Sequence, residues 1–176
     1  MKKILLLIYL APFLFNIPVG LAYNDTVSMP VGWYLLFVPQ NIKIGDTVLA
    51  CAPANKYSMQ GIRRGYIGRV INGNCIDDTK YLVKKVASTP FDDVILTPAG
   101  IEVNGRLSRY KVISYLYYKN RSGKYKETIK HYPFGKYIVN GYFLISTRKK
   151  LSYDSRYYGP VKKIAYKAEF LGKHIL

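Results

Sequence analysis

The chain has 176 residues, of which 49% are hydrophobic, which suits one packed domain and excludes an intrinsically disordered protein. Its 27 lysines and arginines outnumber 10 acidic residues, for a formal net charge of +17. These charges are spread along the chain without a long basic run or a nucleic-acid-binding motif, so they indicate attraction to anionic lipid headgroups rather than to nucleic acid.

The first 22 residues predict an export segment. A start with two lysines precedes the apolar stretch Ile4–Ala22, which as a helix would rise about 28 Å, close to the ~30 Å hydrocarbon thickness of a bilayer. Two interpretations remain open: a signal peptide cleaved after the small-x-small run at residues 20–22, or a retained anchor whose lysines stay in the cytoplasm. In both cases residues 23–176 form an exported domain.

Beyond Pro30 the sequence predicts many short strands, because β-branched and aromatic runs alternate with turn residues. The expected strands are Trp33–Val38, Thr47–Cys51, Gly65–Ile71, Tyr81–Ala87, Val94–Thr97, Ile101–Val103, Tyr110–Tyr118, Tyr137–Thr147 and Ile164–Phe170. Ala54–Gly61 is expected to form one or two helical turns, and residues 106–136 a hairpin or small inserted lobe. The predicted fold class is therefore mostly β.

The two cysteines, Cys51 and Cys75, suit a disulfide in an exported domain. Two unpaired buried thiols or a metal site are the alternatives at this stage. The only histidines, His131 and His174, lie too far from the cysteines in sequence to form a recognisable zinc motif. No metal and no organic cofactor is predicted.

Ser28, six residues beyond the apolar stretch, is a candidate nucleophile. A serine hydroxyl needs a base to take its proton, and neither histidine lies in a recognisable motif. A lysine can replace histidine if burial lowers its pKa from about 10.4. The predicted strand Tyr81–Ala87 offers Lys84 and Lys85, each flanked by apolar residues two positions apart, so strand periodicity leaves both open.

Three motifs in order carry a family resemblance. They are Ser28-Met29-Pro30, Lys84-Lys85-Val86, and the distal run Ser152-Tyr153-Asp154-Ser155-Arg156, which continues through Val161. Together they resemble the bacterial signal peptidase I family, and within it the conjugative-transfer peptidases called TraF, from about Thr26 to Val161. Residues 146–151 and 90–93 depart from the housekeeping signal peptidase pattern and favour the TraF branch.

This resemblance implies an antiparallel β fold with an N-terminal apolar helix, and a role for each matching residue. Ser28 would be the nucleophile, Lys84 the general base, Thr26 with the Ser28 backbone N–H the oxyanion donors, Ser152 the residue that orients Lys84, and Asp154 and Arg156 a supporting ion pair. Lys85 takes the place of the family's arginine. Met29 and Val83 are expected to contact the substrate.

The resemblance further implies an exported serine endopeptidase that processes precursor proteins of a conjugative type IV secretion system, with a precursor pilin as the expected substrate. A general signal peptidase and a non-catalytic adaptor of the same fold are the alternatives. We expect the inner membrane with a periplasmic catalytic domain, or the periplasm if residues 1–22 are removed. The anchor is favoured because it holds Ser28 close to the membrane surface. Hydrolysis and cyclisation of the product both remain open.

Overall fold

The computed structural model describes residues 17–107, 111–112, 115–120, 123–148 and 152–174. This part of the chain is mostly β, with antiparallel strands and few helices, as predicted. The strands are β1 (Pro18–Asn24), β2 (Gly32–Phe37), β3 (Thr47–Ala50), β4 (Leu82–Ser88), β5 (Asp93–Thr97), β6 (Gly100–Val103), β7 (Arg106–Leu107), β8 (Tyr115–Asn120), β9 (Gly123–Thr128), β10 (Gly135–Ile138), β11 (Phe143–Ile145) and β12 (Tyr166–Gly172). The helices are α2 (Lys56–Arg63), α3 (Ser155–Tyr158) and a 3₁₀ turn (Ile76–Asp78).

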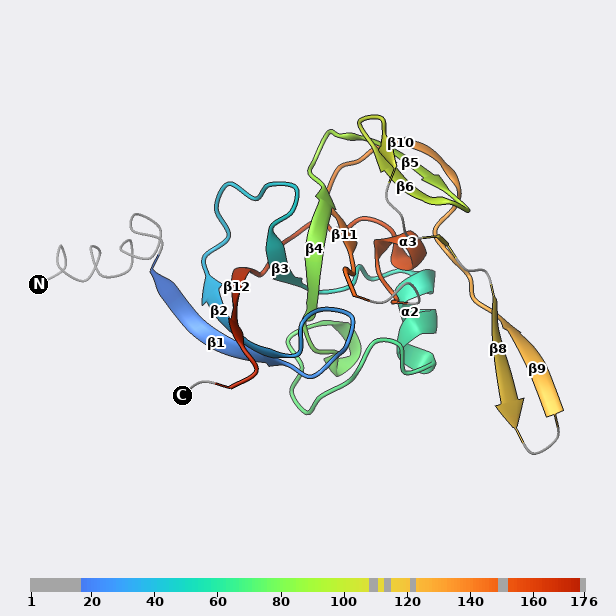
Figure 1. Cartoon of the computed structure of the whole chain (residues 1–176), viewed down its shortest axis with the longest axis horizontal. Coiled ribbons are helices and arrows are strands. Elements are labelled where there is room, and N and C mark those ends of the chain that lie inside the picture. The colour runs from blue at the N-terminus through green and yellow to red at the C-terminus, as the bar shows by residue number, and fades with distance from the viewer. Residues whose placement is uncertain (1–16, 108–110, 113–114, 121–122, 149–151, 175–176) are drawn as a thin grey trace, which may run out of the picture.

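Six strands form the main sheet, in the order β1-β2-β12-β3-β4-β11. Every neighbouring pair is antiparallel. The C-terminal strand β12 lies between β2 and β3 and pairs with both (Figure 1). Strand β4 is an inner strand between β3 and β11, so its side chains are largely covered.

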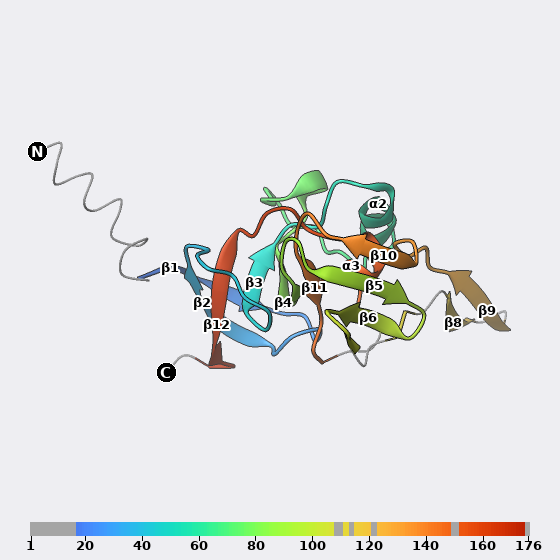
Figure 2. The same ribbon diagram turned by 90° about the horizontal axis from the view of Figure 1, so that it is seen from above.

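A second sheet has the order β10-β5-β6-β7, and β8 and β9 form a separate hairpin. The views in Figures 1 and 2 place the second sheet between the main sheet and the hairpin, which extends away from the rest. Asn104 and Gly105 both have positive φ and make the tight turn between β6 and β7. The predicted insertion at 106–136 includes the hairpin, but the second sheet already begins at Asp93.

The core consists of two clusters of buried apolar side chains. The larger one joins the main sheet to the second sheet and the helices, with Val48, Val86, Leu96, Phe143 and Tyr158 among its members. Helix α2 packs closely on the segment before α3, because a Cβ at Gly61 would lie 2.4 Å from a Tyr153 ring carbon. The smaller cluster packs Met29 against buried side chains of β2, β3, β4 and β12.

The predicted N-terminal helix is wrong at its C-terminal end. Pro18–Ala22 belong to β1 and pair with β2, whereas residues 4–16 lie outside the described residues. Pro18 cannot donate a helical backbone hydrogen bond, and Val19, Leu21 and Tyr23 alternate along the strand as exposed side chains. None of the described helices is long and apolar enough to cross a bilayer.

Three other predicted elements differ from the structure. Residues 65–71 do not form a strand, because α2 continues to Arg63 and Gly65, at φ +71°, ends the helix before a loop. The strand predicted over 137–147 is divided into β10 and β11 at Gly141, which has φ +154° and lies against the Val161 backbone. Of the strand predicted over 110–118, the described part begins at Tyr115.

Candidate active site

Ser28 lies in the turn between β1 and β2, and one side chain holds this turn in shape. Asn24, only 4% exposed, donates from Nδ2 to the carbonyl oxygens of Thr26 at 2.8 Å and Pro30 at 2.9 Å. Its Oδ1 accepts from the Thr26 backbone N–H at 3.2 Å and from the Thr26 hydroxyl at 2.7 Å. The amide of Asn24 therefore fixes the loop on both sides of Ser28.

A second set of contacts holds the backbone of Ser28 itself. The Ser28 carbonyl oxygen accepts hydrogen bonds from the Ser146 hydroxyl and, at 3.2 Å, from the Arg148 backbone N–H. The Ser146 backbone N–H donates in turn to Asp154 Oδ2 at 3.0 Å. The loop that carries Ser28 is thereby connected to the distal motif near the C-terminus.

Lys84 projects from β4 toward Ser28. Its Nζ lies 3.0 Å from Ser28 Oγ and 3.3 Å from the Val83 carbonyl oxygen, and the residue is 4% exposed. Lys85 points to the other side of the strand, where its Nζ donates to the Gly45 carbonyl oxygen at 2.8 Å. The structure thus separates the two lysines that strand periodicity left open.

Burial lowers the pKa of Lys84 from its ordinary value of 10.5 to about 8, because the ammonium loses hydration inside the protein. The negative charge of Asp154 opposes this shift, and the positive charge of Arg156 adds to it. A lysine with this pKa exists partly as a neutral amine near neutral pH. Such an amine is able to accept a proton from a neighbouring hydroxyl.

Asp154 and Arg156 form a fully buried ion pair, each with 0% side-chain exposure. Arg156 binds the carboxylate through two nitrogens, Nε to Oδ1 and Nη2 to Oδ2, both at 2.8 Å. Asp154 also caps α3 by accepting from the Arg156 backbone N–H at 3.2 Å. Two-point binding by Arg156 and the helix cap satisfy the Asp154 carboxylate inside the protein.

Of the remaining predicted residues, Ser152, Thr26 and Val83 lie at the cavity and Met29 does not. Ser152 lines the same cavity as Ser28 and Lys84, but within the described part of the chain its hydroxyl makes no hydrogen bond with Lys84 Nζ. Thr26 Oγ1 lies 3.1 Å from Ser28 Oγ. Val83 lines the cavity, whereas Met29 is packed in the smaller core cluster, so the expectation that Met29 contacts substrate does not fit its position.

A cavity of about 410 Å³ surrounds these groups. Its walls come from the end of β1 and the following turn, the start of β4, the loop after α2, and the distal motif. The lining residues are Tyr23, Asn24, Asp25, Thr26, Val27, Ser28, Gly65, Tyr66, Gly68, Lys80, Tyr81, Leu82, Val83, Lys84, Ser152 and Tyr153. The cavity is thus bordered by two strand segments, one carrying Ser28 just beyond its end and the other carrying Lys84.

Cys51 and Cys75 are joined in a disulfide. The bond closes the segment that contains α2 and the wall residues Gly65, Tyr66 and Gly68. This segment has little regular structure after α2, so the covalent link restricts how far the wall moves from the rest of the cavity.

The fold and the site define the class of protein: the chain belongs to the signal peptidase family, peptidase S26, whose family model matches residues 2–173. It is similar to a plasmid transfer protein TraF of Escherichia coli, with 31% identity over 153 residues, 82% of this chain and 77% of the relative. It is also similar to a conjugal transfer protein TraF of Agrobacterium tumefaciens (strain 15955), with 29% identity, 81% of this chain and 75% of the relative. The resemblance predicted from the motifs is confirmed.

The sequence did not lead us to predict that Asn24 and Ser146 hold the loop that carries Ser28. Asn24 lies two residues before Thr26 at a strand end, where asparagine commonly bonds the backbone of a following turn, so a local signal for it exists. Ser146 lies in the stretch that departs from the housekeeping pattern, and its contact with Ser28 joins residues 118 positions apart. No local pattern predicts such a contact.

Proposed function

We propose that this protein is a serine endopeptidase in which Ser28 is the nucleophile and Lys84 the general base. The observation that carries the proposal is the buried Lys84 amine 3.0 Å from Ser28 Oγ. The depressed pKa of Lys84 supplies the neutral form that a base requires. Membership of the peptidase S26 family supports the same chemistry.

The proton positions suggest how the reaction starts. Thr26 donates its single hydroxyl proton to Asn24 Oδ1 at 2.7 Å, so the 3.1 Å contact between Thr26 and Ser28 is donated by Ser28. When Lys84 is neutral, the Ser28 hydroxyl can turn and donate to Nζ instead. Ser28 Oγ then attacks the substrate carbonyl while its proton passes to Lys84.

The later steps return that proton. The tetrahedral oxyanion would be stabilised by the Ser28 backbone N–H, and by the Thr26 hydroxyl once it turns away from Asn24. Collapse breaks the peptide bond, Lys84 gives its proton to the leaving amine, and an acyl-enzyme forms on Ser28. Attack by water or by an amine, activated by the again neutral Lys84, then releases a linear or an amide-joined product.

We propose a precursor pilin or another exported protein of a conjugative type IV secretion system as the substrate. The names of two relatives, plasmid transfer protein and conjugal transfer protein, support this choice. We further propose that the enzyme is held at the inner membrane, near anionic lipid, with its catalytic domain in the periplasm. A non-catalytic adaptor is less consistent with a buried lysine. Burying a charged side chain lowers the stability of a fold, and an adaptor would gain no catalytic activity in return.

The decisive test is co-expression of the full chain with the precursor pilin of its own conjugative system, followed by intact mass measurement of the pilin. We expect a shortened product with the unmodified enzyme and only the uncleaved precursor with Ser28→Ala. A cyclic product would weigh one water less than the linear product. Cleavage that continues with Ser28→Ala would refute the proposed nucleophile.

The rate of cleavage should depend on pH in the direction set by Lys84. Since only neutral Lys84 accepts the serine proton, kcat/KM should rise as pH increases through about 8 and then level off. At pH 7 only about one molecule in ten has a neutral Lys84. A profile of kcat/KM against pH with a precursor-derived peptide measures this; a rise centred near the ordinary lysine pKa would contradict the proposed environment.

A further inference from the structure

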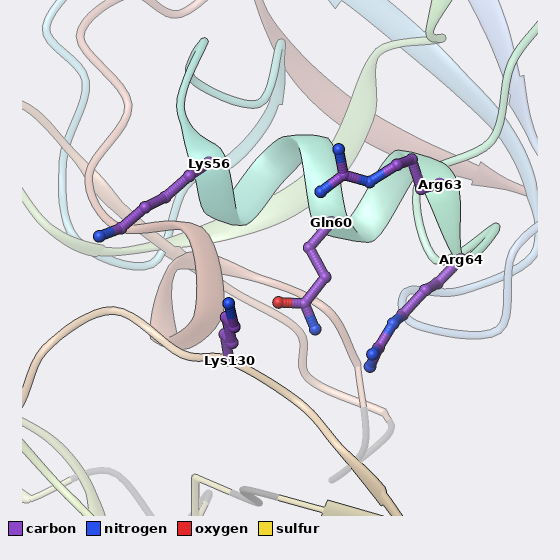
Figure 3. Close-up of a pocket in the computed structure, with 5 residues that line it drawn as sticks. All are labelled: Lys56, Gln60, Arg63, Arg64 and Lys130. Carbon is purple, nitrogen blue, oxygen red and sulfur yellow. The ribbon is translucent and has the colours of Figure 1, made fainter.

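A second pocket, separate from the Ser28 cavity, lies along one face of α2. Lys56, Gln60, Arg63 and Arg64 are spaced by four, seven and eight residues from the first, which places them on one side of a helix. With Lys130 from the segment after β9 they enclose about 250 Å³ (Figure 3). None of these residues lines the active-site cavity.

The pocket concentrates positive charge. Four of its five lining residues are lysine or arginine, and no carboxylate lines it. Among the described residues Lys56, Arg63 and Lys130 form no ion pair, while five of the chain's ten acidic residues pair with other cations. Lys56 also lies at the helix N-terminus, where the backbone dipole already disfavours a cation. An anion bound here would interact favourably with several cations and with the N-terminus of α2.

Gln60 organises the floor of the pocket. It is 6% exposed, and in Figure 3 it lies between Lys130 and Arg64. In the orientation that satisfies its neighbours, its amide oxygen accepts from the Lys130 backbone N–H at 3.2 Å and from Arg64 Nη1 at 3.1 Å. Arg64 Nη1 also donates to the Thr128 carbonyl oxygen at 2.7 Å. These contacts hold Arg64 in place and tie the helix to the segment carrying Lys130.

We propose that this pocket binds a phosphate group. Lysine and arginine form strong charge-assisted hydrogen bonds with phosphate oxygens, and a compact polyanion matches a group of several cations better than one carboxylate does. The volume admits one or two linked phosphates and is small for a folded partner. The phosphate could belong to a free ligand or to a phospholipid headgroup, which share this chemistry.

The test uses the full chain purified in an uncharged detergent and titrated by calorimetry with inorganic phosphate and with pyrophosphate. The pocket variant is Arg63→Gln with Lys130→Gln. Its matched control, Lys162→Gln with Lys163→Gln, removes the same charge from exposed residues elsewhere. We expect the pocket variant to weaken binding about tenfold or more and the control to change it by less than about twofold. The single variant Lys56→Gln should give an intermediate loss.

A second arm uses mixed micelles containing phosphatidic acid or, for comparison, only phosphatidylcholine. Pocket-dependent binding of free phosphate or pyrophosphate identifies a soluble ligand, and pocket-dependent binding of phosphatidic acid micelles alone identifies a headgroup; both support the site. Equal losses in the pocket and control variants would overturn it, as would no binding of any phosphate probe or tighter binding of a glutamate-rich peptide. Melting temperatures without ligand show that each variant is folded, which keeps these outcomes independent of cleavage activity.

Discussion

Lys84→Arg should reduce precursor cleavage by about a thousandfold or more, because losing one member of a nucleophile–base pair typically removes most of the rate enhancement. Arginine remains protonated in proteins, so it cannot take the proton of Ser28. The variant keeps a positive charge close to the same position, which separates loss of the base from loss of charge. Cleavage is measured by intact mass over time with the precursor as substrate.

Lys85→Arg is the matched control for this variant. Lys85 lies next to Lys84 in the sequence, yet its amine contacts the Gly45 carbonyl oxygen on the other side of β4. We expect cleavage within about twofold of the unmodified enzyme, as for most surface substitutions. Thermal melting of both variants establishes that the fold is retained. A folded Lys84→Arg enzyme with normal turnover would refute the Ser/Lys mechanism.

Arg156→Met should lower the free energy of unfolding by about 3–5 kcal/mol, because it leaves the Asp154 carboxylate buried without its cation. The carboxylate cannot reach water, since its side chain is 0% exposed. Asp154 also accepts a hydrogen bond from the Ser146 backbone N–H at 3.0 Å, so the loop that carries Ser28 should become less rigid in the same variant. Urea unfolding of the oxidised protein, followed by tryptophan fluorescence, measures the loss of stability.

Two further variants test whether the loss of stability comes from the burial of the Asp154–Arg156 pair. Asp154→Asn combined with Arg156→Met removes both charges and should recover a large part of the lost stability. Lys167→Met breaks the more exposed pair with Asp46, whose atoms are 3.1 Å apart, and should change stability by about 1 kcal/mol or less. An equal loss in Arg156→Met and Lys167→Met would show that burial of the Asp154–Arg156 pair has no special effect.

Local sequence patterns predicted most strands, whereas the residues that meet around Ser28 were predicted from the family resemblance. Aromatic residues and leucines mark β2, and β-branched residues mark β3 and β4. In each strand, residues with high strand propensity are among the ones that become buried. The choice between Lys84 and Lys85 needed the family motif, because both have apolar neighbours two positions away. In the structure, Lys84 is the lysine near Ser28 because its face of β4 packs against the β1–β2 turn. This packing is a tertiary contact, which strand periodicity does not specify.

Other features depended on contacts that no local pattern encodes. The apolar composition of residues 18–22 suits a membrane helix and a strand equally well, and pairing with β2 decides for the strand. The basic stripe of α2 becomes a pocket only when Lys130 packs beside it. Ser152 reaches the cavity as its motif implied, but its expected contact with Lys84 depends on side-chain positions that the motif does not specify.

The place of β12 in the main sheet also bears on how the two halves of that sheet come together. In the sheet that the structure describes, β2 and β3 do not pair with each other, and β12 joins them through Lys167 and Ala168, which pair on both sides. A chain that emerges with its N-terminus first therefore exposes Ser28 and Lys84 well before the strand that unites the two halves of the sheet arrives. Under the proposed mechanism, Ser28 and Lys84 therefore keep a stable arrangement only once β12 has joined the sheet.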